Sequence, residues 1–353
     1  MFTRKKTRQV LVGNIPVGGK APVVIQSMTN TPTTDIEATV QQIERLSEAG
    51  CKIVRCAIPD QKALRAFASI RNATDVPLVA DIHFQYSYAI GAIEAGADKV
   101  RINPGNIGSR ERVKAVIDAA KQARIPVRIG VNAGSLEKDL LKKFGGPSPE
   151  ALTESALRYI RMMEDFNFSD IVLSIKASDV PTTVQSCILL SKACTYPLHL
   201  GITEAGTVRS GAIRSSVGIG ILLARGIGDT IRVSLSGDPV REIFVAKEIL
   251  KSLKLADGPV VIACPTCGRT QMAVTHLAEK VEDMVSHITV PIKIAVMGCV
   301  VNGPGEAREA DIGIAGGKGK GVLFKQGKEI AKVKEEDLLE TLWKHIQEII
   351  SSK

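Results

Sequence analysis

The sequence predicts an α/β protein: a (β/α)8 TIM barrel over residues 1–256, followed by a small α+β domain over residues 257–353. Strand-like and helix-like segments alternate eight times at roughly the spacing of one βα unit. Aromatic residues are only 4%, while Ala, Val, Ile and Gly are abundant, as expected where parallel strands pack against helices. A chain of 353 residues is also longer than one core usually supports, which predicts a second domain.

The barrel prediction begins with a hairpin of residues 9–12 and 15–17 that turns at Gly13-Asn14. Eight strands are then expected at residues 23–28, 53–58, 78–83, 99–103, 127–132, 171–176, 198–204 and 230–236. The first helix is expected to begin at a capping box, Thr34-Asp35-Ile36-Glu37, and to end before Gly50. The later helices are expected at residues 61–73, 87–95, 110–123, 149–165, 181–193, 208–224 and 239–253.

The main alternative fold is an open doubly wound sheet. That fold would favour a Gly-x-Gly-x-x-Gly motif after the first strand, whereas Met28 is followed by Thr-Asn-Thr-Pro-Thr-Thr. The closed barrel is therefore the preferred prediction.

The second domain is expected to begin at the break Asp257-Gly258-Pro259. Its predicted strands are residues 260–263, 292–296, 311–314 and an edge strand at 322–325, and its predicted helices are 271–285 and 335–350. Residues 316–321 are rich in Gly and Lys but lack the ending of a phosphate-binding loop, so a flexible turn is expected there.

Charged and other polar side chains interrupt the predicted barrel strands, although strands covered on both faces should be almost purely apolar. These side chains keep a period of two, so each strand directs them to one face. The set comprises Arg55, Asp81, His83, Arg101, Asn103, Arg128, Asn132, Lys176, Glu204, Arg232, Ser234 and Ser236. Structural ion pairs could account for single members, since buried Arg and Lys are usually paired. Two carboxylates, Asp81 and Glu204, cannot balance five cations.

This imbalance predicts an anionic ligand of at least two charges at the carboxyl ends of the strands, where barrel sites lie. A diphosphate fits better than a monophosphate, because Arg binds phosphate oxygens in bidentate fashion and Lys adds a point charge. The net charge of +9 could also suit a nucleic acid or an acidic protein. Charge inside a concave mouth with few aromatic residues weakens the nucleic-acid interpretation.

The sequence has no run of 18 apolar residues, so no membrane span is expected. Residues 1–10 are basic but lack the apolar region of a signal peptide. Four of the seven cysteines, Cys51, Cys56, Cys187 and Cys194, lie in apolar surroundings and are expected to be inert core thiols. An odd number of cysteines argues against a disulfide framework, so a reducing cytoplasmic location fits.

The remaining thiols form a Cys-x-x-Cys pair, Cys264 and Cys267, and a third position, Cys299, in a glycine-rich segment. Structural zinc would need a fourth ligand such as His276 or His287. A thioredoxin-type redox pair is expected in different surroundings. An iron–sulfur cluster held by three thiolates would leave one iron for another ligand or for substrate. The spacing alone leaves these alternatives open.

The segments 264–270, Cys-Pro-Thr-Cys-Gly-Arg-Thr, and 297–307, Met-Gly-Cys-Val-Val-Asn-Gly-Pro-Gly-Glu-Ala, closely resemble the 4-hydroxy-3-methylbut-2-enyl diphosphate synthase family. The strand ends Ile-Gln-Ser-Met-Thr-Asn-Thr, Ala-Asp-Ile-His-Phe, Arg-Ile-Asn-Pro-Gly-Asn and Gly-Ile-Thr-Glu-Ala-Gly resemble it independently. The resemblance covers essentially the whole chain. It corresponds to the short bacterial form, because Leu253 and Val260 leave no room for the extra domain of plant-type members.

The resemblance implies reductive opening and dehydration of 2-C-methyl-D-erythritol 2,4-cyclodiphosphate in non-mevalonate isoprenoid biosynthesis. It implies a [4Fe–4S] cluster, flavodoxin or ferredoxin as electron donor, and a head-to-tail homodimer in which the cluster domain of one chain caps the barrel of the other. The implied cluster ligands are Cys264, Cys267, Cys299 and Glu306. The implied substrate contacts are Arg55, His83, Arg101, Arg128, Asn132, Lys176, Arg232 and Ser234. Glu204 is the implied acid/base group, and Asn302 is implied to lie close to substrate and cluster.

Two other interpretations compete with this one. A phosphate-handling barrel lyase or aldolase with a structural zinc appendage would use the same cationic mouth. A basic nucleic-acid-binding protein with a zinc module would use the net charge instead. Stoichiometric zinc without iron or sulfide would favour either of them.

Overall fold

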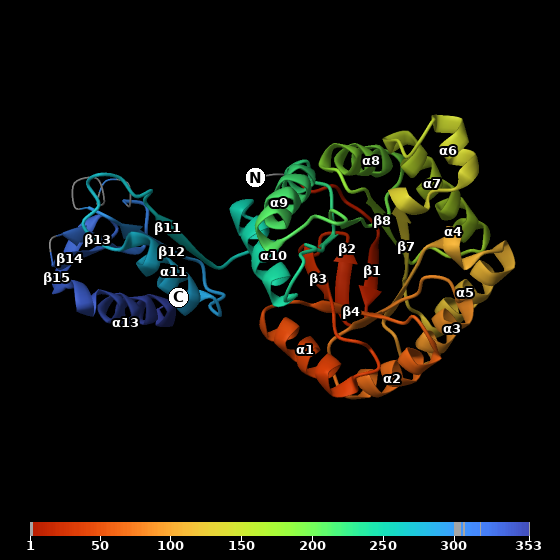
Figure 1. Cartoon of the computed structure of the whole chain (residues 1–353), viewed down its shortest axis with the longest axis horizontal. Coiled ribbons are helices and arrows are strands. Elements are labelled where there is room, and N and C mark those ends of the chain that lie inside the picture. Colours follow the sequence, from red (N-terminus) through yellow and green to blue (C-terminus); the bar gives the residue numbers. More distant parts are fainter. Residues whose placement is uncertain (1–2, 300–304, 306–307, 318, 353) are drawn as a thin grey trace. The chain divides into compact units, whose positions relative to one another are not determined.

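The computed structural model describes residues 3–299, 305, 308–317 and 319–352. The chain divides into two compact units, Met1–Ala256 and Asp257–Lys353. Figure 1 colours the first unit from red to blue-green and the second in blue. Among the described helices, none combines the length and apolarity that crossing a bilayer requires.

The first unit is a parallel eight-stranded barrel, as predicted. Its strands are β3 (Val24–Met28), β4 (Ile53–Ala57), β5 (Leu78–Asp81), β6 (Lys99–Ile102), β7 (Val127–Asn132), β8 (Ile171–Lys176), β9 (His199–Leu200) and β10 (Thr230–Ile231). They hydrogen-bond in the order β8-β7-β6-β5-β4-β3-β10-β9. A parallel bridge between Leu173 and Leu198 joins the two ends of this order and closes the barrel.

Several predicted strands are too long. The strands predicted at 198–204 and 230–236 pair over only two residues each, in β9 and β10. The chain leaves the barrel wall soon after Gly201 and reaches a turn at Glu204, whose φ of +53° is left-handed. Similarly, β6 ends at Ile102 because Asn103 caps a short helix by accepting a hydrogen bond from the Gly105 N–H. These residues form loops at the mouth instead of extending the ladder.

Eight helices correspond to the predicted ones and surround the barrel (Figure 1). They are α1 (Ile36–Glu48), α2 (Gln61–Asn72), α3 (Tyr86–Glu94), α5 (Arg110–Ala123), α7 (Pro149–Asp165), α8 (Val180–Ala193), α9 (Val208–Ala224) and α10 (Val240–Ser252). The capping-box prediction is wrong in one detail, because Asp35 rather than Thr34 caps α1 and accepts from the Ala38 N–H. The short helices α4 (Pro104–Ile107) and α6 (Lys138–Phe144), which follow β6 and β7, were not predicted.

The N-terminal hairpin, β1 (Gln9–Val12) and β2 (Ile15–Gly18), is antiparallel as predicted. Its buried valines pack against residues near the amino ends of four barrel strands, forming a cluster of Val10, Val12, Val17, Val24, Ile53, Val79 and Val172. The hairpin therefore closes the amino end of the barrel and leaves the carboxyl end as its mouth.

The second unit is a mixed five-stranded sheet in the order β11-β12-β13-β14-β15. Its strands are β11 (Pro259–Ala263), β12 (Ile292–Met297), β13 (Ile312–Gly317), β14 (Lys320–Lys325) and β15 (Lys328–Lys334), and its helices are α11 (Val274–Val285) and α13 (Leu338–Ser351). The pairs β11–β12 and β12–β13 are parallel, and the remaining pairs are antiparallel. The apolar sides of both helices pack in the core of this unit.

Two predictions for the second unit need correction. The predicted edge strand at 322–325 lies in β14, which pairs with both β13 and β15 and is therefore not an edge. The edges of the sheet are β11 and β15, and β15 was not predicted as a strand although its several lysines are typical of exposed edges. Residues 316–321 are not simply a flexible turn, because Gly316 pairs with Gly321 in the β13–β14 ladder. A Cβ at Gly316 would clash with Met272 Sδ, and one at Gly321 would clash with Leu338 Cδ1. Close packing on the hairpin explains these two glycines.

Candidate functional site

The interior of the barrel holds the predicted cations. Their neighbours along the strands, such as Val54 and Val100, pack in the core beneath the helices. Because side chains alternate along a strand, Arg55 and Arg101 face the interior instead. Residues 101 and 128 are register partners on β6 and β7, so their side chains start from adjacent positions.

Asp81 is the carboxylate around which part of this set gathers. Its Oδ1 lies 3.2 Å from Arg101 Nη1, and its Oδ2 lies 3.8 Å from Arg55 Nε and 3.4 Å from His83 Nε2. Burial alone would raise the pKa of Asp81, but Arg55, the hydrogen bond from His83, and Arg101 hold it well below its usual range. Asp81 is therefore ionised and fixes the orientation of three predicted contacts.

Within the described part of the chain, Arg128 and Lys176 form no ion pair with a carboxylate. Arg128 is 1% exposed, and its Nε and Nη1 have no hydrogen-bond partner among the described residues. Burial, followed by the positive charges of Arg55 and Arg101, lowers the pKa of Arg128. Burial and the charges of Arg128 and Arg232 likewise lower the pKa of Lys176. Both side chains would be stabilised by an anion between them.

Arg232 has a counter-ion that the sequence reasoning missed. Its Nε lies 3.4 Å from an oxygen of Glu242 on α10, and Glu242 also accepts hydrogen bonds from Ser27 Oγ and the Leu235 N–H. Glu242 lies on the same helical stripe as the buried Ala246. A carboxylate on an apolar stripe was the signal that could have revealed it.

Glu204 is placed differently from the expectation. It is exposed in the turn after β9, rather than at the end of a strand, and it takes part in none of the ion pairs found among the described residues. The expectation that Glu204 is one of the two carboxylates facing the five cations is therefore wrong. The buried counter-charges are Asp81 and Glu242, and Glu204 lies at the carboxyl end of the barrel.

The other predicted contacts also lie at this end. His83 is half exposed, Asn132 is the last residue of β7, and Ser234 is half-buried after β10.

Two interior glycines give the cations room. A Cβ at Gly130 would lie 2.7 Å from Arg101 Nε, and one at Gly201 would lie 2.7 Å from Lys176 Nζ.

A further polar layer lies one step toward the amino ends of the strands and was not predicted as part of the site. Lys99 Nζ donates to Gln26 Oε1 at 3.2 Å, and His199 Nδ1 lies 2.8 Å from Thr230 Oγ1. All four residues are buried. The two-residue alternation along a strand could have indicated these residues. Lys99 precedes Arg101 by two residues and His199 precedes Gly201 by two, so each faces the same side of its strand.

In the second unit, two cysteine-bearing loops meet at one edge of the sheet. Cys264 follows β11, Cys299 lies two residues after the end of β12 at Met297, and these parallel strands pair at Ala263 and Val296. The Gly298 N–H donates to Cys264 Sγ at 3.0 Å. The two segments are thus in direct contact, as expected for loops at the carboxyl ends of adjacent strands.

Cys267 is exposed, and a backbone N–H of Arg269 lowers its pKa. Hydrogen bonds from N–H groups to sulfur favour thiolates, which are the form that binds iron or zinc. Among residues 3–299, 305, 308–317 and 319–352, no three His, Cys, Asp or Glu side chains are grouped so as to hold a metal ion. The predicted residues Asn302 and Glu306 lie outside the described residues.

The other cysteines differ from this group. Cys51, Cys56 and Cys187 are buried, as predicted for core thiols, and Cys194 is half-buried. Burial raises the pKa of Cys51 and of Cys187 to about 12. These thiols are therefore protonated and inert near neutral pH.

Comparison with known proteins identifies the family. The GcpE TIM-barrel domain matches residues 7–247, and the GcpE protein C-terminal domain matches residues 260–348. The chain belongs to the GcpE family. A similar protein from Clostridium perfringens (strain 13 / Type A) is 59% identical over 349 residues, which cover 99% of this chain and all of that protein. One from Caldanaerobacter subterraneus subsp. tengcongensis is 58% identical over 351 residues and 99% of each chain. Both carry the name 4-hydroxy-3-methylbut-2-en-1-yl diphosphate synthase (flavodoxin).

The fold of the GcpE barrel also occurs outside the family. Dihydropteroate synthase from Stenotrophomonas maltophilia is similar with a TM-score of 0.50 and 15% sequence identity, covering 70% of this chain and 98% of that structure. At this identity the likeness concerns the fold alone.

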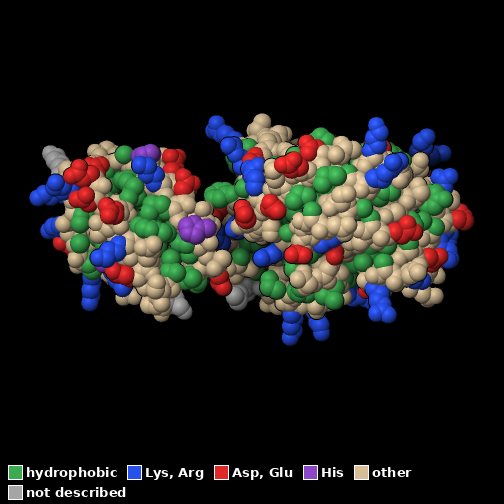
Figure 2. All heavy atoms as spheres, turned by 90° about the horizontal axis from the view of Figure 1, so that it is seen from below, with side chains coloured by type: hydrophobic (Ala, Val, Ile, Leu, Met, Phe, Trp, Pro, Cys, Tyr) green, Lys and Arg blue, Asp and Glu red, His purple; other side chains and the backbone are tan. Residues whose placement is uncertain are grey.

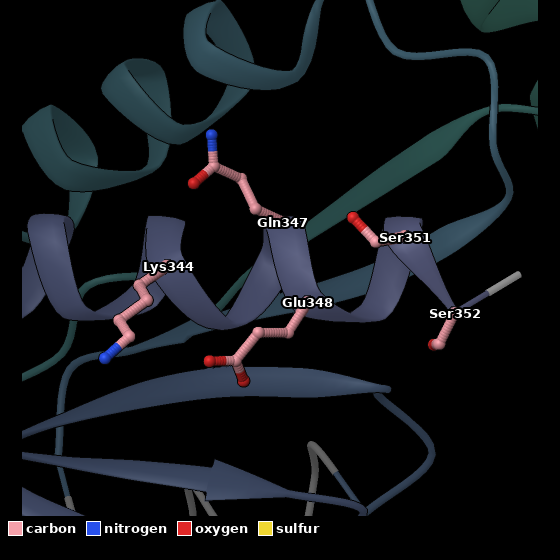
Figure 3. A pocket seen from close by; sticks show the side chains of 5 residues that line it. All are labelled: Lys344, Gln347, Glu348, Ser351 and Ser352. Atoms are coloured by element: carbon pink, nitrogen blue, oxygen red, sulfur yellow. The ribbon is translucent and has the colours of Figure 1, made fainter.

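The visible surface of this GcpE chain shows no clustering of charge comparable to that in the barrel interior. Figure 2 shows basic and acidic side chains interspersed over the visible face of the molecule rather than gathered by sign. A surface hollow on α13 is lined by Lys344, Gln347, Glu348, Ser351 and Ser352 (Figure 3). Its residues belong to α13 and the C-cap residue that follows it, and include none of the predicted site residues.

Proposed function

We propose that this chain reductively opens 2-C-methyl-D-erythritol 2,4-cyclodiphosphate and removes water to form 4-hydroxy-3-methylbut-2-enyl diphosphate. The observation that carries this proposal is the buried cationic set around Asp81, in which Arg128 forms no ion pair with any residue that the structure describes. Full-length similarity to proteins named for the diphosphate product supports the same substrate class. The reaction belongs to non-mevalonate isoprenoid biosynthesis, and the cytoplasm is its expected location.

In this proposal residues 1–256 bind the substrate. Arg55, Arg101 and Arg128 hold the diphosphate, while Lys176 adds a point charge. Arg232, His83, Asn132 and Ser234 complete the contacts at the mouth. The same cations stabilise the negative charge that the diphosphate gains when its carbon–oxygen bond breaks, and the arrangement is already present before substrate binds.

Residues 257–353 are proposed to hold a [4Fe–4S] cluster through Cys264, Cys267, Cys299 and Glu306. The cluster, when bound, would supply two electrons one at a time from flavodoxin or ferredoxin. The N–H···S contact at Cys264 and the lowered pKa of Cys267 fit thiolate ligands. The zinc alternative is less well supported, because His276 and His287 are exposed and His287 packs edge-on against Trp343.

Glu204 is proposed to donate the proton with which the substrate hydroxyl leaves as water. Its exposed position in a turn at the carboxyl end of the barrel would let it reach a ligand from the rim. Asn302 is proposed to contact the same substrate. Closing this mouth would exclude water from reactive species. A head-to-tail homodimer, with the second unit of one chain over the barrel of the other, is the proposed means of closure.

The decisive experiment is turnover of the cyclodiphosphate by the anaerobically purified, reduced protein. Bound iron and sulfide with product formation are expected, and stoichiometric zinc without iron would refute the cluster.

Glu204→Gln is expected to abolish most turnover while keeping substrate affinity, so full turnover would remove the acid/base role.

Mixing a Cys264→Ser chain with a Glu204→Gln chain tests the dimer. Recovered activity would support capping in trans, and its absence would favour capping within one chain.

A further inference from the structure

Lys99 occupies an unusual position beneath the predicted anion site. It is completely buried, and its ammonium group reaches from β6 to Gln26 on β3. These strands are separated in the barrel wall by β5 and β4. The Lys99 side chain therefore crosses the interior, below Arg101 and above the apolar cluster that contains Val24 and Val79.

The surroundings of Lys99 oppose a positive charge. Its hydrogen-bond partner is a neutral amide, and the charged groups that act on it are Arg128 from β7 and Arg55 from β4. From β9, His199 faces the same interior and is itself buried. No ion pair among the described residues gives Lys99 a carboxylate. Burial, followed by Arg128 and Arg55, lowers its pKa well below the usual value.

Unpartnered polar atoms lie in the same region. Gln26 Nε2, His199 Nε2 and two nitrogens of Arg128 are buried without a hydrogen-bond partner among the described residues. Natural proteins rarely leave several buried polar atoms unsatisfied in one place unless a ligand or water completes them. Because, among the described residues, Arg128 carries an unpaired charge and Lys99 has only a neutral amide as its partner, a negatively charged occupant is favoured here.

We propose that Lys99 regulates the charge of this site: it takes up a proton from solvent when a diphosphate binds at Arg128, and it loses the proton when the anion leaves. This inference rests on the proposed function, because it takes the diphosphate as the ligand. A bound anion offsets the fields of Arg128 and Arg55, so it favours the ammonium form of Lys99. Lys99 does not need to touch the ligand and acts as a positioning residue.

Proton uptake predicts how affinity depends on pH. The liganded protein holds more protons than the free protein, so affinity must fall as the pH rises. Full uptake of one proton would weaken binding about tenfold for each pH unit. The Lys99→Met variant should show a weaker dependence, because its side chain cannot titrate.

The probe is a dialkyl diphosphate, whose charge is fixed near neutral pH. Titration calorimetry in two buffers of different ionisation enthalpy measures the protons taken up per ligand bound. The wild-type chain is expected to take up a substantial fraction of a proton, and Lys99→Met at most half as much. Lys114→Met is the matched control, since Lys114 is exposed on α5 and paired with Asp118. It should behave as wild type.

Lys176 provides the main competing explanation, because its own burial also disfavours its charge. If the wild-type chain and Lys99→Met take up equal numbers of protons, the proton binds at Lys176 or at another group, and the inference is overturned. Binding without uptake would overturn the inference and leave the proposed function intact. Absence of binding to the wild-type chain would overturn both. Lys99→Gln is measured as a second variant that cannot titrate, in case Lys99→Met is destabilised. Thermal unfolding checks that both variants are folded.

Discussion

Replacing Arg128 by methionine should stabilise the empty protein and weaken its binding of diphosphate. Methionine has a similar length but no charge. In the wild-type chain, Arg128 is buried with Nε and Nη1 unpartnered, and Arg55 and Arg101 repel it. Its charge therefore opposes folding in the absence of an anion, whereas a bound anion would make it favourable.

The magnitudes follow from these contacts. Replacing a buried ion pair by apolar residues of similar volume gains about 1–4 kcal/mol in favourable cases, and we expect a gain in the same range for Arg128, which is unpaired among the described residues. Such a gain would raise the thermal midpoint of a barrel of this size by roughly 2–4 °C per kcal/mol. Losing one charged hydrogen bond to the ligand costs about 1.5–3 kcal/mol, which raises the dissociation constant roughly 10- to 150-fold.

Thermal unfolding of the unliganded protein and calorimetric titration with a dialkyl diphosphate measure the two effects. Arg110→Met is the control, because Arg110 is exposed on α5 and paired with Asp165. It should change stability by less than about 0.5 kcal/mol and leave affinity unchanged. A less stable Arg128→Met protein with unchanged affinity would show that Arg128 has a structural role only.

Three other outcomes test the site. Gly130→Ala should weaken diphosphate binding roughly tenfold, because its Cβ would lie 2.7 Å from Arg101 Nε and displace a charged hydrogen-bond donor. Gly220→Ala, which adds a Cβ to open space, should leave binding unchanged, and equal effects of both changes would contradict the steric explanation. In metal-free folded protein, iodoacetamide should modify Cys267 well before Cys187, since a backbone N–H lowers the pKa of the first thiol and burial raises that of the second to about 12. Mass spectrometry should show Cys267 labelling slow down as the pH falls and the thiol becomes protonated, and labelling that does not depend on pH would refute the thiolate assignment.

The barrel could be predicted because its βα period is a local property of the chain. Apolar runs, helical stripes and caps each lie within a few residues. The lengths of β9 and β10 could not be predicted in the same way. Whether residues 201–204 pair depends on neighbouring strands that are distant in sequence, and here the chain turns away to Glu204.

The cationic site shows the same division. A period of two along the strands was enough to place Arg55, Arg101 and Arg128 on one face, and the barrel brings those faces together. Glu242 could be noticed in the sequence as a carboxylate on an apolar stripe, but its partner could not be assigned, because it reaches Arg232 only after α10 packs against the barrel. Lys99 was overlooked since a single lysine at a strand start does not reveal what lies across the barrel.

By itself, the sequence determined the alternation of strands and helices, the face that carries the cations, and the cysteine motif with its family resemblance. Each of these depends on residue identity and short spacing. Only the tertiary structure decided which cations are paired, which are left without a counter-ion, and that Lys99 crosses the interior to Gln26. Those properties depend on distance and burial, which exist only once the strands close into a barrel.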